Sequence, residues 1–428
     1  MKILNGNSRN FDKTLDRILS LRKRKLQSKS VVVTKIVQDI KNNGDKALLK
    51  YEKRFNKNNI IIPSSKQIYK SIKSLDKKVK KAIDDAFNRI YKFHSLQKFK
   101  NISYIDKYKN KIDYKYLPLD SVAIYVPGST VSYPSSVLMT AIPALVAGVK
   151  RIVMINPGFR GKQNPAVLYA AKKCKIKEIY SIGGPSSIAA VAYGTKKIKS
   201  VNKIVGPGNK FVTAAKKIVF GDVGIEAMSA GPSEILIIGD KTSNPSWLAS
   251  DLIGQAEHDI LAQCILISKD RNMLEETKKE IFKQLKEIPR NSIAKKSLMT
   301  NGILMNVNSE KKIIKIINKI GPEHLEINLK NCKSLISNIK NAGSICLGKY
   351  AVMAMTDYGV PGTNHVLPTN MTSKYSSGLN VSEFMKKISY INLSKKGIES
   401  LGPSVITLAN YEGLAGHAQS VKKRIRRI

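Results

Sequence analysis

The run Val122-Ala-Ile-Tyr-Val-Pro-Gly128 decides the fold class, because a short β-branched segment ends abruptly in Pro-Gly. Similar short runs recur after it, separated by longer stretches of helical periodicity, at residues 151–155, 178–182, 234–238, 265–268, 303–307 and 344–347. Strands that alternate with helices are typical of parallel sheets. The sequence therefore predicts an α/β fold with at least two such sheets.

Glycine and proline are concentrated between residues 127 and 232, each time just beyond a strand-like or extended run. The pairs and triplets are Pro127-Gly128, Gly184-Pro185, Gly206-Pro207-Gly208 and Gly231-Pro232. In α/β sheets, ligands bind in the crevice beyond such strand ends. We therefore expect ligand-binding turns in this part of the chain.

The segments that flank the alternating region read as helical. Residues 31–51 are amphipathic, and Ser64 or Ser65 offers an N-cap for a helix of about 30 residues whose apolar stripe runs to Phe93. His94 follows this stripe, so we interpret it as structural. The last 50 residues show no comparable strand pattern and are predicted to form a helical extension.

Composition limits the class of protein. The chain has 428 residues, 42% of them hydrophobic, and no run of about 18 uncharged apolar residues that could span a bilayer. Its polar N-terminus lacks the apolar segment of a secretory signal, so we expect a cytoplasmic protein. The four cysteines form no Cys-x-x-Cys pair, which argues against both a disulfide framework and a thiolate zinc site.

The net charge of +43, from 74 Lys and Arg against 31 Asp and Glu, raises nucleic acid as a partner. The lysines are spread over the whole chain, however, and the only dense basic run is residues 422–428. Dispersed, solvated lysines need no partner. Nucleic-acid binding therefore stays only as the alternative.

Four of the five histidines lie in polar clusters that could carry chemistry. Gln255 and His258 stand at i and i+3 of a helical pattern, which would place an amide and an imidazole on one face, either as metal ligands or as a surface pair. Glu323-His324 follows Gly-Pro at the start of a short strand and could share proton transfer, or form a solvated turn.

Asp357 lies in a loop rich in glycine and proline, as a hard ligand or as an Asx turn. His417, with Glu412 five residues before it, is unusual in a terminal extension and could reach another subunit's site. From the residues alone, the sequence indicates a possible metal site of His, Asp and Gln in an α/β protein.

Together these clusters resemble the sequence motifs of histidinol dehydrogenases, and they occur in the same order along the chain. The matching stretches begin at Tyr125 (YVPG), Tyr133 (YPSSVLM), Val205 (VGPGNKFVT), Ala230 (AGPSEI), Gln255 (QAEH), Gly321 (GPEHL) and Gly362 (GTNHVLPT). They extend over about residues 30 to 420, so the resemblance covers nearly the whole chain.

The resemblance implies the last two steps of histidine biosynthesis, in which L-histidinol is oxidised through L-histidinaldehyde to L-histidine with two NAD and one zinc ion per site. The implied zinc ligands are Gln255, His258, Asp357 and His417, the last from the partner chain of a homodimer. The implied catalytic pair is Glu323 and His324. The implied substrate contacts are Ser233, Gln255, His258, His324, Asp357, His365, Glu412 and His417. The implied NAD contacts are Tyr125, Ser186 and Asn209.

The family architecture implies two Rossmann-like lobes, one inserted in the other. Residues 23–124 and 235–378 would form the main domain with the zinc and catalytic residues, and residues 125–234 the inserted domain with the NAD contacts. Residues 1–22 and 379–428 would be small helical extensions, the second swapped in the dimer. No Gly-x-Gly-x-x-Gly fingerprint is present, so only the resemblance implies the dinucleotide.

Two departures from the family pattern concern the site. One residue more than usual separates Asp357 from His365, so we expect either a bulged loop or a displaced side chain. Ser186 replaces an amide that would touch NAD, which predicts a lower cofactor affinity. The rival interpretations are a basic nucleic-acid-binding protein on a degenerated dehydrogenase scaffold and a zinc hydrolase that uses Glu323 and His324.

Overall fold

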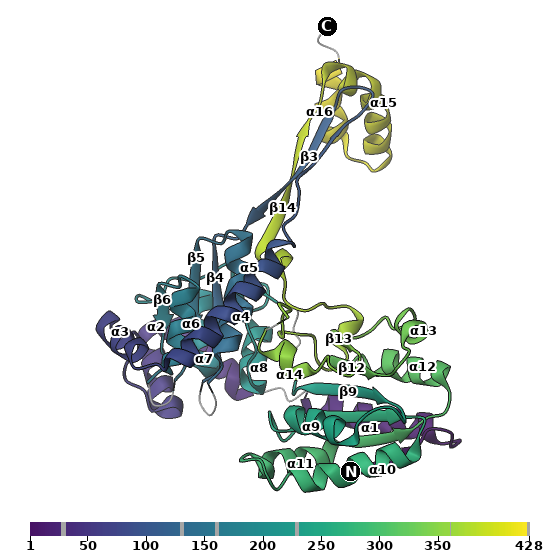
Figure 1. Cartoon of the computed structure of the whole chain (residues 1–428). Helices are drawn as coiled ribbons and strands as arrows, with labels where there is room; N and C mark the ends of the chain where they lie inside the picture. Colours follow the sequence, from purple (N-terminus) through teal and green to yellow (C-terminus); the bar gives the residue numbers. More distant parts are fainter. Residues whose placement is uncertain (27–30, 129–131, 159–161, 227–230, 360, 426–428) are drawn as a thin grey trace.

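The structure, a computed structural model, describes residues 1–26, 31–128, 132–158, 162–226, 231–359 and 361–425. Two α/β lobes lie next to each other, and a long arm projects from one of them and carries the C-terminus at its tip (Figure 1). Each lobe is built on a parallel sheet, which confirms the predicted fold class.

The first lobe contains a five-stranded parallel sheet in the order β6-β5-β4-β7-β8. Its strands are β4 (Ser121–Tyr125), β5 (Arg151–Ile155), β6 (Glu178–Tyr180), β7 (Lys203–Val205) and β8 (Gly224–Ile225). The central strand β4 is buried along its whole length, which explains why the sequence shows it as a continuous apolar run. The strand order reverses beside β4, so a crevice is expected beyond the carboxyl ends of β4 and β7.

Helices cover both faces of this sheet. They are α2 (Val31–Tyr51), α3 (Ser65–Lys73), α4 (Lys77–Ser95), α5 (Pro134–Ala147), α6 (Pro165–Lys173), α7 (Gly184–Tyr193) and α8 (Lys210–Val219). The resemblance implies that residues 23–124 belong to the same domain as residues 235–378. In the structure, helices from this segment pack on the first lobe instead: α2 shares a core with β4, β5 and α7, and α4 shares one with α5 and α6. Which sheet a helix covers depends on tertiary packing, and an apolar stripe alone does not encode it.

The predicted helix of about 30 residues is in fact two helices, α3 and α4. Ser64 caps α3 with a reciprocal capping box, as predicted, but Asp76 then caps a new helix by accepting hydrogen bonds from the backbone N–H groups of Lys78 and Val79. The apolar spacing continues across this break because both helices face the same core, through Ile72 and Ile83.

The second lobe contains a six-stranded parallel sheet in the order β1-β11-β10-β9-β12-β13. Its strands are β1 (Lys2–Asn5), β9 (Glu234–Gly239), β10 (Gln263–Ser268), β11 (Ile303–Asn306), β12 (His324–Asn328) and β13 (Ser344–Leu347). Its helices are α9 (Pro245–Ala256), α10 (Arg271–Gln284), α11 (Asn291–Asn301), α12 (Glu310–Ile320), α13 (Lys333–Ile336) and α14 (Met353–Asp357).

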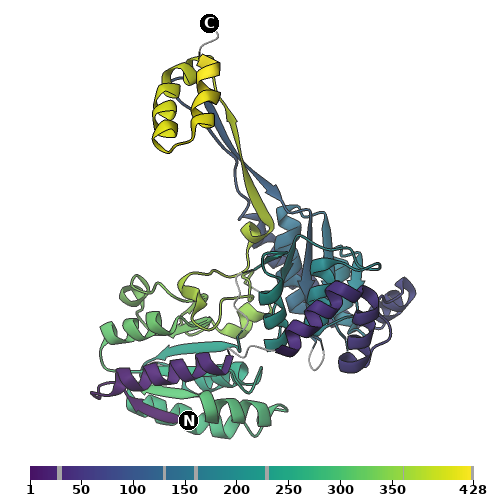
Figure 2. The same ribbon diagram turned by 180° about the vertical axis from the view of Figure 1, so that it is seen from behind.

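The N-terminal residues belong to this second lobe. Strand β1 pairs with β11, and helix α1 (Phe11–Leu26) lies across the sheet (Figure 2). Phe11, Leu15 and Leu19 of α1 are buried in the core against β9 and β10. Residues 1–22, which the sequence suggests are a separate helical extension, are therefore an edge strand and a covering helix of the lobe.

The arm is a three-stranded antiparallel ribbon that ends in a helical hairpin. Its elements are β2 (Ile102–Ile105), β3 (Lys111–Pro118), β14 (Met385–Asn392), α15 (Lys395–Tyr411) and α16 (Ala415–Ile425). Strand β14 was not predicted, because seven of its eight residues are exposed and no alternation of buried and exposed residues marks it. Short helical turns at Thr372–Lys374 and Val381–Phe384 lead into it.

All of the predicted β-branched runs form strands of the two parallel sheets. Among the described helices, none combines the length and the apolar character needed to cross a membrane.

Candidate active site

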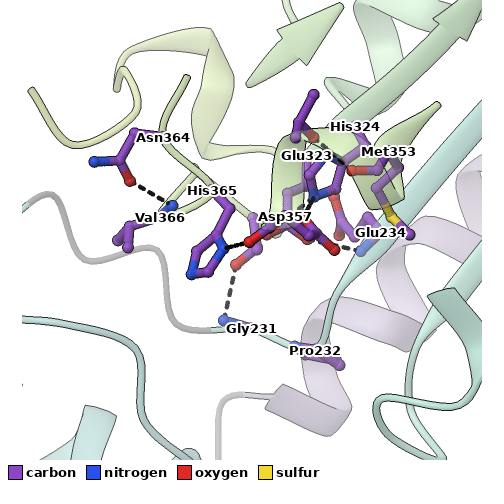
Figure 3. A network of polar contacts seen from close by, with 12 residues as sticks. Gly231, Pro232, Glu234, Glu323, His324, Met353, Asp357, Asn364, His365 and Val366 are labelled. Carbon is purple, nitrogen blue, oxygen red and sulfur yellow. Dashed lines mark hydrogen bonds and ion pairs between the residues drawn. The ribbon is translucent and has the colours of Figure 1, made fainter. Parts of the chain in front are cut away.

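The Glu323–His324 pair lies where β12 begins, at the amino end of the six-stranded sheet and close to the other lobe (Figure 3). Both side chains are buried, and His324 Nε2 lies 4.0 Å from Glu323 Oε1. The backbone N–H of Glu234, in the neighbouring strand β9, donates a 2.9 Å hydrogen bond to Glu323 Oε2. Strand pairing between β9 and β12 therefore fixes the carboxyl group in place.

Burial sets the protonation state of this pair. It raises the pKa of Glu323 well above its usual value, and repulsion from the Glu234 and Asp357 carboxylates adds to the rise. Burial, together with the neighbouring His365 and His258, lowers the pKa of His324 to about 3. His324 is thus a neutral imidazole at physiological pH with a ring nitrogen free to accept a proton, and it is a weak base as long as nothing nearby stabilises its charged form.

Asp357 and His365 converge on the same point from the loop that follows α14. His324 Nε2 lies 3.7 Å from Asp357 Oδ1, and His365 Nδ1 contacts the Asp357 carbonyl at 2.5 Å. A carbonyl only accepts hydrogen bonds, so Nδ1 carries the proton and Nε2 of neutral His365 is left as an acceptor. Ser136 Oγ, at the start of α5, lies 3.5 Å from this Nε2.

The longer spacing between Asp357 and His365 falls within this loop. Gly359 and Gly362 adopt positive φ values of 71° and 102°, and the loop packs against α4 of the other lobe. Both Asp357 and His365 lie beside His324. The choice between a bulged loop and a displaced side chain stays a prediction, because residue 360 lies outside the described part of this loop.

Helix α9 brings Gln255 and His258 toward this cluster. Gln255 is buried in the last turn of the helix, and its amide nitrogen has no hydrogen-bond partner among the described residues. His258 lies just beyond the helix end and is exposed, and its charged form would repel a proton on either His324 or His365. The two residues lie at the same end of α9, although only Gln255 is within the helix.

These residues fit a zinc ion as an incomplete ligand set. An amide, an imidazole and a carboxylate are donors that zinc accepts, and the amide of Gln255 and Nδ1 of His324 are buried with unused hydrogen-bonding capacity. Among the residues that the structure describes, no three His, Cys, Asp or Glu side chains could hold a metal by themselves. Any complete site here needs donors from elsewhere.

Glu412 and His417 do not join this cluster within the chain. Glu412 follows α15, His417 belongs to α16, and both are exposed at the end of the arm, remote from the two lobes (Figure 1).

The residues implied to contact NAD gather at the carboxyl edge of the five-stranded sheet. Tyr125 ends β4 and accepts a 3.3 Å hydrogen bond from the N–H of Gly184. Asn209, just after β7, is exposed and caps α8. Ser186 is buried, and its hydroxyl donates a 3.1 Å hydrogen bond to Glu52 Oε1 in the protein interior. Ser233, implied to contact substrate, is partly buried just before β9.

Two charged residues that the sequence does not single out, Arg22 and Glu234, lie next to the Glu323–His324 pair. Arg22 of α1 lies 3.1 Å from Glu234 Oε1 and also donates to the carbonyl of Pro232. Glu234 Oε1 in turn accepts from the N–H of Asn370. Only one feature of the sequence could have indicated this ion pair: the apolar run at residues 234–238 begins with an acidic residue, Glu234, where a buried charge needs a partner.

Comparisons with known proteins identify the family of the chain. The family model for histidinol dehydrogenase matches residues 20–425. The histidinol dehydrogenase of Pelagibacter ubique (strain HTCC1062) is 73% identical over 427 residues, covering 100% of both chains. That of Bacillus subtilis (strain 168) is 43% identical over 399 residues, covering 92% of this chain and 93% of the relative.

A crystal structure of histidinol dehydrogenase from Elizabethkingia anophelis matches with a TM-score of 0.91 at 35% identity, covering 100% of this chain and 98% of that one. The family model, the sequence identities and the fold thus lead to one conclusion. The chain belongs to the histidinol dehydrogenase family.

Proposed function

We propose that this protein oxidises L-histidinol through L-histidinaldehyde to L-histidine, with zinc and NAD, in a homodimer whose subunits share their active sites. The observation that carries the proposal is the convergence of Glu323, His324 and Asp357 between the two lobes, with His324 held neutral. The comparisons give no support to the nucleic-acid-binding alternative.

His324 would accept the proton of the substrate hydroxyl in the first oxidation. Glu323 would then take a proton from the water that hydrates the aldehyde, a role that suits a buried carboxylate because its raised pKa makes it a stronger base once deprotonated. When bound, zinc would supply an anchor for the imidazole and amine of histidinol, and NAD would supply the hydride acceptor. Because the side chains of Glu323 and His324 are buried between the two lobes, the aldehyde intermediate would be retained at the site.

The arm supports the proposed dimer. Apolar side chains stay exposed along its ribbon and hairpin, including Ile105, Ile391, Leu408 and Tyr411, at 61%, 66%, 61% and 92%. Helix α15 buries only Gly397, Gly402 and Ala409, and α16 only Ala418, which is too little apolar surface to stabilise a free hairpin. A second copy of the chain would cover these residues and receive His417 and Glu412 near its own Gln255.

Four free cysteines, three of them buried, are compatible with a reducing compartment, and we place the reaction in the cytoplasm.

The first test is the number of NADH molecules formed per histidinol consumed by zinc-quantified protein, with and without a chelator. Two NADH per histidinol, abolished by chelation, are expected. If an ester of histidinol were hydrolysed and no NADH formed from histidinol while zinc stayed bound, the proposal would be refuted in favour of a zinc hydrolase.

The shared site is tested by mixing two inactive variants, His258→Ala and His417→Ala, and allowing the subunits to exchange. Random pairing makes half of the dimers mixed, and each mixed dimer holds one site with both residues intact, so about a quarter of wild-type activity should return. Sites built within single chains would give no recovery. Two copies of the same variant, mixed in the same way, are the control.

A further inference from the structure

Glu52 is a buried carboxyl group to which the reaction assigns no role. It begins a π-helical turn (Glu52–Asn56) directly after α2 and is 0% exposed. No Lys or Arg within the described residues forms an ion pair with it, and the two basic residues that follow, Lys53 and Arg54, are exposed. A buried, unpaired acid is costly to keep, so its contacts are informative.

Those contacts lead to the N-terminus of α7. Glu52 Oε1 accepts hydrogen bonds from the N–H of Gly183 and the hydroxyl of Ser186, both at 3.1 Å, while Oε2 accepts from Asn56 Nδ2 at 2.5 Å. Gly183 is the N-cap of α7 and has no side chain with which to cap the helix. Glu52, 131 positions earlier in the chain, satisfies the N-cap N–H instead.

Tyr125 holds the same turn at the next residue. The N–H of Gly184 donates to its phenol oxygen at 3.3 Å. Burial, with a smaller contribution from the nearby charge on Glu52, raises the pKa of Tyr125 to about 12. Gly184 has a φ of 67°, and no atom lies within 4 Å of where a side chain would begin. The inner side of the turn formed by residues 183–186 is therefore fixed, and open space lies beside Gly184.

We propose that Glu52 is a positioning residue for the dinucleotide, which fixes the turn of residues 183–186 from inside the lobe and, when ionised, opposes the binding of the cofactor's phosphates. The inference rests on the proposed function, because it takes Tyr125 and the α7 turn as part of the NAD site. A helix N-terminus attracts anions through its free N–H groups and its dipole. The ionised carboxylate of Glu52 at the N-terminus of α7 would compete with the cofactor's phosphates for the same N–H groups and the same helix dipole.

The charge of Glu52 changes within the working pH range of an enzyme. Burial raises its pKa to about 7, against the lowering effect of its bonds with Gly183, Asn56 and Ser186. The elements around it present these neutral partners and one titratable group, the phenol of Tyr125, which stays neutral to far higher pH. Cofactor affinity should therefore fall as pH rises through about 7, because Glu52 loses its proton.

The experiment measures the equilibrium Kd of NADH by fluorescence between pH 6 and 8.5, on zinc-loaded full-length protein. For the wild type, Kd should rise about tenfold over this range, a change of roughly 1.4 kcal/mol. Glu52→Gln keeps the acceptor oxygen for Gly183 and Ser186 but cannot ionise, so its Kd should stay near the low-pH value of the wild type. KM for histidinol and zinc content should not change.

Two further variants make the result specific. Ser186→Ala removes one anchor and leaves the charge, so it should weaken NADH binding severalfold at every pH and keep the pH dependence. Asp39→Asn alters an acid on α2 that bonds to Asn43, Lys50 and Tyr51 and does not contact the turn, so it should leave Kd unchanged.

The outcomes separate the inference from the proposed function. If the wild type binds NADH but Glu52→Gln shows the same pH dependence, or if the variant binds poorly at every pH, the role of Glu52 is refuted and the NAD site remains. If the wild type shows no NADH binding, the NAD proposal itself is wrong. Should Glu52→Gln fail to fold, an unchanged Kd for Ser186→Ala would equally overturn the inference.

Discussion

Replacing Glu52 by Gln should stabilise the protein at neutral and alkaline pH, because the buried carboxyl is unfavourable when charged. Gln has nearly the same shape and can still accept the hydrogen bonds of Gly183 and Ser186 through its amide oxygen. Asn56 can turn its own amide to match the new donor. The substitution therefore removes an ionisable proton with little change in packing.

The magnitude follows from the pKa of Glu52, which is about 7 in the folded protein against an ordinary 4.5. As pH rises from 4.5 to 7, the unfolded chain loses the Glu52 proton while the folded protein keeps it, so the wild type loses stability relative to the variant. At 1.36 kcal/mol per pH unit, the difference levels off at about 3 kcal/mol above pH 7. At pH 5 it should be less than about 1 kcal/mol.

Denaturant unfolding at pH 5, 7 and 8.5 measures this difference, with Asp39→Asn, on the preceding helix α2, as the matched control. Hydrogen bonds from Lys50, Asn43 and Tyr51 lower the pKa of Asp39 to about 2, so that substitution should destabilise the protein over the same range. An equal effect of Glu52→Gln at pH 5 and 8.5, or destabilisation at both, would show that Glu52 is not a buried acid with a raised pKa.

The remaining predictions concern the catalytic cluster and the arm. His324→Ala should lower turnover by about 10² to 10⁴-fold with zinc retained, whereas His258→Ala should lose zinc; metal analysis showing the reverse pattern would overturn the assigned roles. Gly359→Ala would place a Cβ 2.4 Å from Ile90 Cδ1 at a φ of 71°, so turnover should fall severely. Gly348→Ala is the control, because its φ is 85° but no atom lies within 4 Å of the new Cβ. It should lower the free energy of unfolding by only about 1 kcal/mol and keep turnover. Phe384→Ala should cost about 3–5 kcal/mol by urea denaturation, because this fully buried side chain fixes the root of the arm in the first lobe.

The parallel sheets could be predicted from the sequence because their strands are buried on both faces. β4, β9 and β10 have no exposed residue, so each appears as an uninterrupted apolar run. The arm ribbon could not be predicted for the opposite reason. All four residues of β2 are exposed, and nothing in the local pattern shows that β3 and β14, more than 260 residues apart, pair with each other.

The arrangement of the candidate site could be predicted from the sequence only in part. Glu323 and His324 are adjacent in sequence, so their proximity needed no fold, whereas the contacts of His324 with Asp357 and of Ser186 with Glu52 depend on how loops cross the sheets. Glu52 gave no signal at all. It lies in a polar stretch, and only the tertiary fold buries it against the turn before α7.

In the proposed reaction, the two lobes would use one strand order for two kinds of ligand. Apart from the added edge strand β1, both parallel sheets have their first strand in the centre, and the order of the later strands reverses beside it. In the proposed reaction, the five-stranded sheet would bind the dinucleotide at its carboxyl edge, where α7 and α8 begin, because helix N-termini attract phosphates. The six-stranded sheet would hold the metal at its amino edge, where Gln255 lies in the last turn of α9 and His258 just beyond it.

A helix C-terminus carries partial negative charge and favours a cation within its last turn. The opposite use of the two sheets therefore brings a cation-attracting edge and an anion-attracting edge to the same interface between the lobes. The proposed reaction needs this polarity. The carbinol carbon of the metal-bound alcohol must lie next to the hydride-accepting carbon of the dinucleotide, while the metal ion and the phosphates each bind at a separate edge of matching polarity. It also accounts for the role proposed for Glu52, because an ionised carboxylate at the α7 turn would weaken the anion-attracting edge and leave the metal edge unchanged.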